Sequence, residues 1–132
     1  MKSPLPILVL VLMSPLSLYA AESPVLEAYR IAAKQETPAF NGFSAARGEG
    51  FYRAKSGDLA CVSCHGASPK DHGKHATTGN DILPMATVAN PQRFTDAAKV
   101  EKWFRRNCND VLKRACTASE KGDFITYLSS VK

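Results

Sequence analysis

The sequence predicts a single all-α domain, and three observations support this class. Four segments carry apolar residues at the three- and four-residue spacing of amphipathic helices, while no segment alternates as a strand would. The chain has 132 residues, which suits one small domain. Residues 66–93 contain repeated glycine and proline interruptions, and so long a loop in a compact domain is expected to wrap around something.

The N-terminal segment, residues 1–21, is predicted to be a signal peptide. A positive start at Lys2 precedes a mostly apolar run over 5–18, and small residues follow it. An uncleaved membrane anchor is the alternative, but the run is short and contains two prolines. We therefore expect export to the periplasm and a folded domain over residues 22–132.

The charge of the chain is mildly basic, with a formal net charge of +5 at pH 7. The basic residues are spread along the sequence, and no dense basic run or nucleic-acid motif occurs. Binding to nucleic acid is therefore not expected. The positive charge would suit binding to an acidic redox partner. The simpler alternative is that the basic residues only face solvent.

Two helices are predicted in the first half of the domain. The first covers residues 22–36, with Ser23 and Pro24 typical of a helix start. The second covers residues 44–55 and contains Gly48. Glycine inside a helix costs about 1 kcal/mol relative to alanine, a cost that is accepted where two backbones cross closely.

Two further helices are predicted in the second half. One begins with Thr95 or Asp96 as its cap, and the last opens with a capping box of Thr117 and Glu120. Asn107 falls on the inner face of the first of these, where a buried amide without a partner costs about 1–3 kcal/mol. We expect it to bond to backbone, to a side chain or to a cofactor. The whole predicted inner face is Val100, Trp103, Phe104, Asn107, Cys108, Val111 and Leu112.

The pentapeptide CVSCH gives the strongest chemical signal. Cys61 and Cys64 are three residues apart, so a helical turn points both thiols to one side, where they can add to two haem vinyl groups. His65 follows directly and can bind the iron. The motif predicts one covalent haem c. A thiol–disulfide site would need a βαβ context, and a zinc site would need further ligands such as His72 and His75.

The two later cysteines, Cys108 and Cys116, are expected to form a disulfide, since an exported chain meets an oxidising compartment. On one straight helix they would lie about 12 Å apart, beyond the roughly 4.4–6.8 Å of a disulfide. The helix must therefore end near residues 112–114. A staple worth about 2–3 kcal/mol is the favoured role, and a redox-active switch is the alternative.

The residues alone leave the sixth position on the iron open. Met85, His72 or His75 would suit an electron carrier, because methionine and histidine are strong ligands. Asn107 is a fourth candidate, and an open position is a further alternative.

The chain resembles the SHP-type cytochromes c, named for the sphaeroides haem protein. The resemblance implies a class I cytochrome c-like fold around one haem c, with His65 and Asn107 as axial ligands and a Cys108–Cys116 disulfide. Two departures are Met85, where the family has leucine, and Asn80, where it has lysine. The matching segments are FSAARGEGFYR (43–53), CVSCH (61–65), HATTG (75–79), ANPQRFTD (89–96), VEKWFRRNC (100–108) and DVLKRACTASEKGD (110–123).

The resemblance also implies a function. We expect a monomeric periplasmic cytochrome that takes up electrons from a dihaem or membrane b-type cytochrome. It would bind O₂ or NO at ferrous haem after Asn107, a weak oxygen donor, leaves the iron. One alternative is a six-coordinate electron carrier with Met85 as ligand. Another is a haem enzyme that converts oxygen or nitric oxide, for which His75 is the single acid–base candidate.

Overall fold

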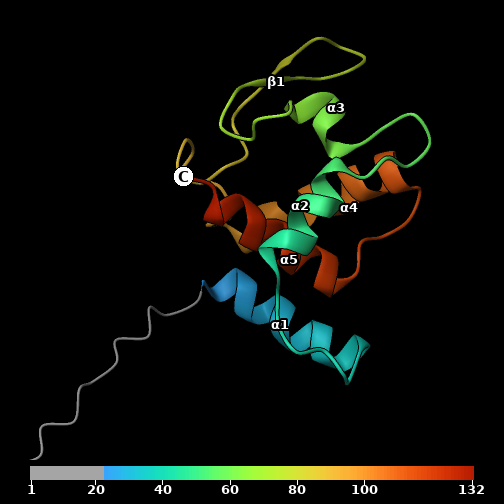
Figure 1. Cartoon of the computed structure of the whole chain (residues 1–132), viewed down its shortest axis with the longest axis vertical. Coiled ribbons are helices and arrows are strands. Elements are labelled where there is room, and N and C mark those ends of the chain that lie inside the picture. Colours follow the sequence, from blue (N-terminus) through green and yellow to red (C-terminus); the bar gives the residue numbers. More distant parts are fainter. Residues whose placement is uncertain (1–22) are drawn as a thin grey trace, which may run out of the picture.

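The computed structural model describes residues 23–132, so the predicted signal peptide lies outside the described residues. The fold is mostly helical with a small sheet, which confirms the predicted all-α class (Figure 1). The elements in chain order are α1 (Pro24–Glu36), α2 (Ala45–Arg53), α3 (Cys61–His65), β1 (Gly73–Lys74), β2 (Asp81–Ile82), α4 (Ala97–Leu112) and α5 (Ala118–Ser130).

The helix starts follow the predicted capping residues. Ser23 caps α1 with its side chain, and Pro24 is the first helical residue. Asp96, and not Thr95, caps α4 by accepting the backbone N–H of Lys99. The Thr117–Glu120 capping box opens α5 as expected.

Helices α2 and α5 cross in close contact at Gly48. A Cβ on Gly48 would lie 2.0 Å from the Asp123 carbonyl oxygen and 2.7 Å from the Tyr127 Cβ. The glycine predicted to allow a close backbone crossing therefore has that role. Asp123 reinforces the crossing, because its buried carboxylate accepts the Ser44 N–H at 2.6 Å and the Arg47 Nε at 2.7 Å.

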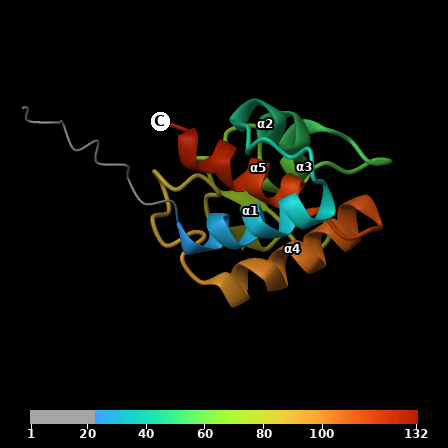
Figure 2. The same cartoon turned by 90° about the horizontal axis from the view of Figure 1, so that it is seen from below.

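Helix α1 packs beside α5 and α4 (Figure 2). A polar contact ties the three together: Tyr29 of α1 donates to Glu101 of α4 at 2.9 Å, and Lys121 of α5 donates to the same carboxylate at 2.9 Å. The Tyr29 ring also packs edge-on against Phe104 of α4.

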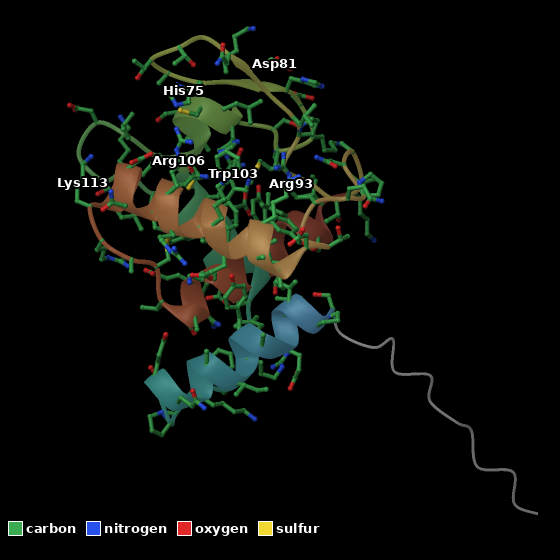
Figure 3. All side chains as sticks on the ribbon, turned by 180° about the vertical axis from the view of Figure 1, so that it is seen from behind. His75, Asp81, Arg93, Trp103, Arg106 and Lys113 are labelled. Carbon is green, nitrogen blue, oxygen red and sulfur yellow. A yellow bond between two sulfur atoms is a disulfide. The ribbon has the colours of Figure 1, made fainter. Side chains whose placement is uncertain are left out.

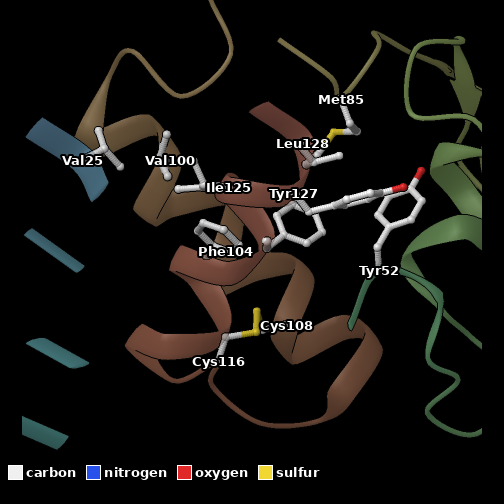
Figure 4. Packing of buried hydrophobic residues seen from close by; sticks show 11 residues of the cluster. Val25, Tyr52, Met85, Val100, Phe104, Cys108, Cys116, Ile125, Tyr127 and Leu128 are labelled. Atoms are coloured by element: carbon white, nitrogen blue, oxygen red, sulfur yellow. A yellow bond between two sulfur atoms is a disulfide. The ribbon is translucent and has the colours of Figure 1, made fainter. Parts of the chain in front are cut away.

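The core lies among the helices and includes the disulfide-bonded cysteines (Figure 4). Tyr52, Ile125 and Leu128 are almost completely buried. No helix in the described residues is long and apolar enough to cross a membrane.

One expectation about the long loop was wrong. No strand was predicted there, but β1 and β2 form an antiparallel pair with Gly73 opposite Ile82 and Lys74 opposite Asp81. Each strand has two residues, too few for an alternating pattern to be visible in the sequence.

Candidate haem site

A single cavity of about 970 Å³ brings together the residues predicted to hold the haem. Its walls include Cys61, Cys64 and His65 of α3 and Asn107 of α4, with mainly apolar neighbours. Figure 3 shows His75 and Asp81 on the hairpin side, with Trp103 and Arg106 of α4 across from them. A cavity of this size is at the upper end of those that hold cofactors in proteins.

Helix α3 is fixed at both ends. At its start the Ala60 N–H donates to the Ser63 hydroxyl at 3.0 Å, so the middle of the CVSCH motif caps its own helix. At its end Gly66 takes a φ of 79°, a left-handed conformation that suits glycine. The buried Tyr52 hydroxyl donates to the Gly66 carbonyl at 2.7 Å, which ties α3 to α2.

The hairpin presses directly on α3. A Cβ on Gly73 would lie 2.1 Å from the Cys64 carbonyl oxygen and 2.8 Å from the His65 Cα. Only a residue without a side chain allows β1 to approach so closely. The β1–β2 hairpin, which was not predicted from the sequence, therefore helps to hold the CVSCH helix in place.

The chemistry of α3 fits a covalently attached haem. Burial, with a smaller effect of Arg93, lowers the pKa of His65 to about 4, so its imidazole is neutral at pH 7 and able to ligate a metal. Its Nδ1 is buried without a hydrogen-bond partner in the described residues. Cys61 and Cys64 are not joined to each other and both face the cavity.

The same chemistry argues against the two alternatives for CVSCH. Burial raises the pKa of Cys61 to about 11, whereas a thiol–disulfide nucleophile needs a lowered pKa. Within the described residues, no three His, Cys, Asp or Glu side chains converge as a zinc site requires.

The face of α4 predicted to point inward is buried at some positions and exposed at others, which corrects the uniformly inward face predicted from the sequence. Val100, Phe104 and Cys108 are buried, whereas Trp103 is 42 % exposed and Asn107 is exposed. All five side chains line the cavity, but Trp103 and Asn107 do not belong to the buried core. Helical periodicity cannot separate the two cases, because a face that meets a cofactor is as apolar as one that meets another helix.

The disulfide begins at the residue that follows Asn107 in the chain. Cys108 and Cys116 are joined, with their Cα atoms 5.7 Å apart. Helix α4 ends at Leu112, and Lys113 takes a left-handed φ of 59°, so the chain folds back between the cysteines.

The other ligand candidates are placed differently. Met85 lines the cavity but is 8 % exposed and belongs to the core, and its N–H donates to the Pro69 carbonyl at 2.9 Å. His72 is exposed, pairs with Asp81 and does not line the cavity. His75 lines the cavity, and its Nδ1 accepts backbone N–H groups.

Arg93 is a residue of the site to which sequence reasoning gave no role. Its guanidinium lines the cavity and donates to the carbonyls of Leu83 and Pro84, both at 2.8 Å. The sequence offered a signal, because Arg93 stands within the ANPQRFTD segment of the resemblance.

Comparison with known proteins gives close matches in sequence and in structure. Cytochrome c-type protein SHP of Cereibacter sphaeroides is 48 % identical over 71 residues, which cover 54 % of this chain and 54 % of that protein. Cytochrome c'' of Methylophilus methylotrophus is 41 % identical over 105 residues, which cover 76 % of this chain and 73 % of that protein. The first match therefore spans about half of its relative.

The solved structures of these proteins have the same fold. Oxidised cytochrome c'' matches with a TM-score of 0.73 and 37 % identity, over 82 % of this chain and 92 % of that chain. Oxidised SHP, described as an oxygen-binding cytochrome c, matches with a TM-score of 0.71 and 37 % identity, over 81 % of this chain and 94 % of that chain.

The fold and these relatives define the class of protein: a monohaem c-type cytochrome with one covalent haem c. Residues 38–128 also match a family model described as a domain of unknown function, DUF1924. The chain belongs to this family and to the SHP-type cytochromes c, which confirms the resemblance found in its sequence.

Proposed function

We propose that this chain is a periplasmic cytochrome that binds a diatomic gas, O₂ or NO, when its haem is reduced. Cys61 and Cys64 would hold the haem by thioether bonds, His65 would be the permanent axial ligand, and Asn107 the releasable one. When bound, the haem supplies an iron that accepts one electron and offers a position for the gas. The observation that carries the proposal is that α3 and α4 direct these four residues into one cavity.

The chemistry of Asn107 explains why it would leave. A neutral amide oxygen is a hard, weak donor, so it suits ferric iron better than ferrous iron. After release, the Asn107 N–H remains in the cavity wall and can donate a hydrogen bond to the bound gas. The solution structure of cytochrome c'' is described as bearing on haem-ligand detachment, and SHP is described as oxygen-binding, which supports the same behaviour here.

Met85 is the ligand of the competing proposal, a plain six-coordinate electron carrier. Its position in the cavity wall keeps this alternative open to test. Two contacts favour Asn107, because the loop of Met85 is bonded to Pro69, four residues after His65, and to α5 through Leu128. Its side chain lies beside Leu128 in the core (Figure 4). We infer that these contacts hold the Met85 loop on the same side of the cavity as His65, whereas a sixth ligand must approach the iron from the other side.

The electron donor in this proposal is a dihaem or membrane b-type cytochrome, as the resemblance implies. The export prediction supports a periplasmic location, where such a donor would meet the protein. Without the predicted signal peptide, which contains Lys2, the net charge falls from +5 to +4 (17 − 1 − 12), and this basic balance favours a donor with an acidic docking surface.

The test is an absorption spectrum of the reduced holoprotein under argon, before and after CO is added. We expect high-spin ferrous haem that shifts on CO addition. Asn107→Ala should alter the ferric spectrum, while the volume-matched control Met85→Leu should leave it unchanged. A low-spin ferrous spectrum that ignores CO, or a ferric change in Met85→Leu alone, would establish the electron carrier instead.

A further inference from the structure

We propose that Arg93 binds a propionate carboxylate of the haem and thereby raises the reduction potential of the protein. The inference rests on the proposed seating of the haem in the cavity between α3 and α4. It starts from a feature of the cavity that haem attachment leaves unexplained: a half-buried guanidinium whose charge is not neutralised.

The hydrogen bonds of Arg93 fix its orientation without satisfying its charge. Nη2 donates to the carbonyl oxygens of Leu83 and Pro84 at 2.8 Å, and Nε donates to the Pro84 carbonyl at 3.2 Å. Nη1 has no partner among the described residues, and no described carboxylate forms an ion pair with this arginine. Burial lowers the pKa of Arg93, because desolvation disfavours its charged form. An anion in the cavity would offset that cost.

The carboxylates in the cavity wall are already engaged elsewhere. Asp81 pairs with His72 of the hairpin, and Asp96 caps α4 by accepting the Lys99 N–H at 2.9 Å. Asp110 lies 3.9 Å from Arg106 on the same helix. A haem propionate in the cavity would supply the anion that these carboxylates do not.

The other cations of the wall are less suited to this role. The Arg106 guanidinium lies over the Trp103 ring and near Asp110, and Lys113 donates to the Asp110 carbonyl at 2.8 Å. Lys99 is exposed. Arg93 combines partial burial, a fixed position and an unused donor, and its planar fork matches a carboxylate. Haem c carries two such groups.

A cation beside the haem has a predictable redox effect. Reduction adds one negative charge, so a fixed positive charge stabilises the ferrous state. At an effective dielectric constant of about 20, a unit charge about 12 Å away changes a one-electron equilibrium roughly tenfold. A tenfold change corresponds to about 59 mV. Arg93 would thus favour the state in which Asn107 is released.

The experiment measures the midpoint potential of the holoprotein and the proton NMR shifts of its propionate methylenes. Arg93→Gln should lower the midpoint potential by about 59 mV, the equivalent of a tenfold change, and should move the propionate resonances. Arg93→Lys should restore part of the potential while still moving the resonances, because it keeps the charge and loses the fork. Lys102→Gln is the matched control, since Lys102 is exposed and lies outside the cavity wall. We expect it to shift the potential far less.

Two results would overturn the inference. One is a potential in Arg93→Gln that moves no further than in Lys102→Gln, and the other is a lowered potential with unmoved propionate resonances. If Arg93→Gln does not yield folded holoprotein, Arg93→Lys is the test. Moved propionate resonances in that variant would support the inference, and unmoved resonances would overturn it. CO binding by the wild type is measured separately, so failure of gas binding leaves the Arg93 result interpretable.

Discussion

Replacing Gly48 by alanine tests the helix crossing on which the site is built. Alanine gains about 1 kcal/mol of helix propensity over glycine. Against this, the new Cβ would lie 2.0 Å from the Asp123 carbonyl oxygen, which is backbone and cannot rotate away. Overpacking a core costs about 1–3 kcal/mol, and a backbone clash belongs at the upper end. The expected net loss in the free energy of unfolding is therefore about 2 kcal/mol.

Gly50 provides a control on the same helix. A Cβ there would meet nothing within 4 Å, so Gly50→Ala should stabilise the protein by about 0.5–1 kcal/mol. The assay is thermal unfolding of both holoprotein variants by circular dichroism, in which 2 kcal/mol corresponds to a fall in Tm of about 8 °C or more. If Gly48→Ala melts at or above the wild-type temperature, the close α2–α5 crossing is wrong.

Three further predictions concern the supports of the site. Hydrogen bonding to Arg114 lowers the pKa of Glu120, so its charged form stabilises the fold above the unfolded pKa near 4.5, and this contribution is lost as pH falls through the folded value. Glu120→Gln should lower the free energy of unfolding by at most about 1 kcal/mol at pH 7, measured by urea unfolding. The difference between wild type and variant should shrink as the pH is lowered, and a difference that stays constant would contradict this. Replacing Cys108 and Cys116 by alanine should cost about 2–3 kcal/mol in the same assay, and an unchanged midpoint would show that the disulfide is no staple. Tyr52→Phe removes a hydrogen bond that holds α3 and should cost about 1–2 kcal/mol; an unchanged Tm would exclude that role.

The sequence predicted features that depend on neighbouring residues along the chain. Helix caps such as Ser23 and the Thr117–Glu120 box can be read locally, because their bonds span three residues. The CVSCH motif is equally local, since one helical turn determines where its thiols point. Gly48 could be interpreted because a glycine inside a helix carries a cost that calls for a reason.

The fate of Trp103 and Asn107 could not be predicted in the same way. They share the helical face of Val100 and Phe104, and all four residues line the cavity, yet only Val100 and Phe104 are also buried in the core. Which part of a helix face meets a cofactor depends on what lies across from it, and α3 ends 42 residues before Asn107 (107 − 65). The strands β1 and β2 were missed because each has two residues, too few for an alternating pattern to be visible.

The sequence by itself determined the class of this protein: an all-α domain, a covalent haem c attachment motif and the SHP-type family, since each is a pattern of residue types at fixed spacing. Only the tertiary structure decided which side chains share the cavity. It brought Asn107 into the same cavity as α3 and the hairpin, placed Met85 against α5 (Figure 4) and put Arg93 in the cavity wall. These relations are set by packing between distant segments, which spacing along the chain does not encode.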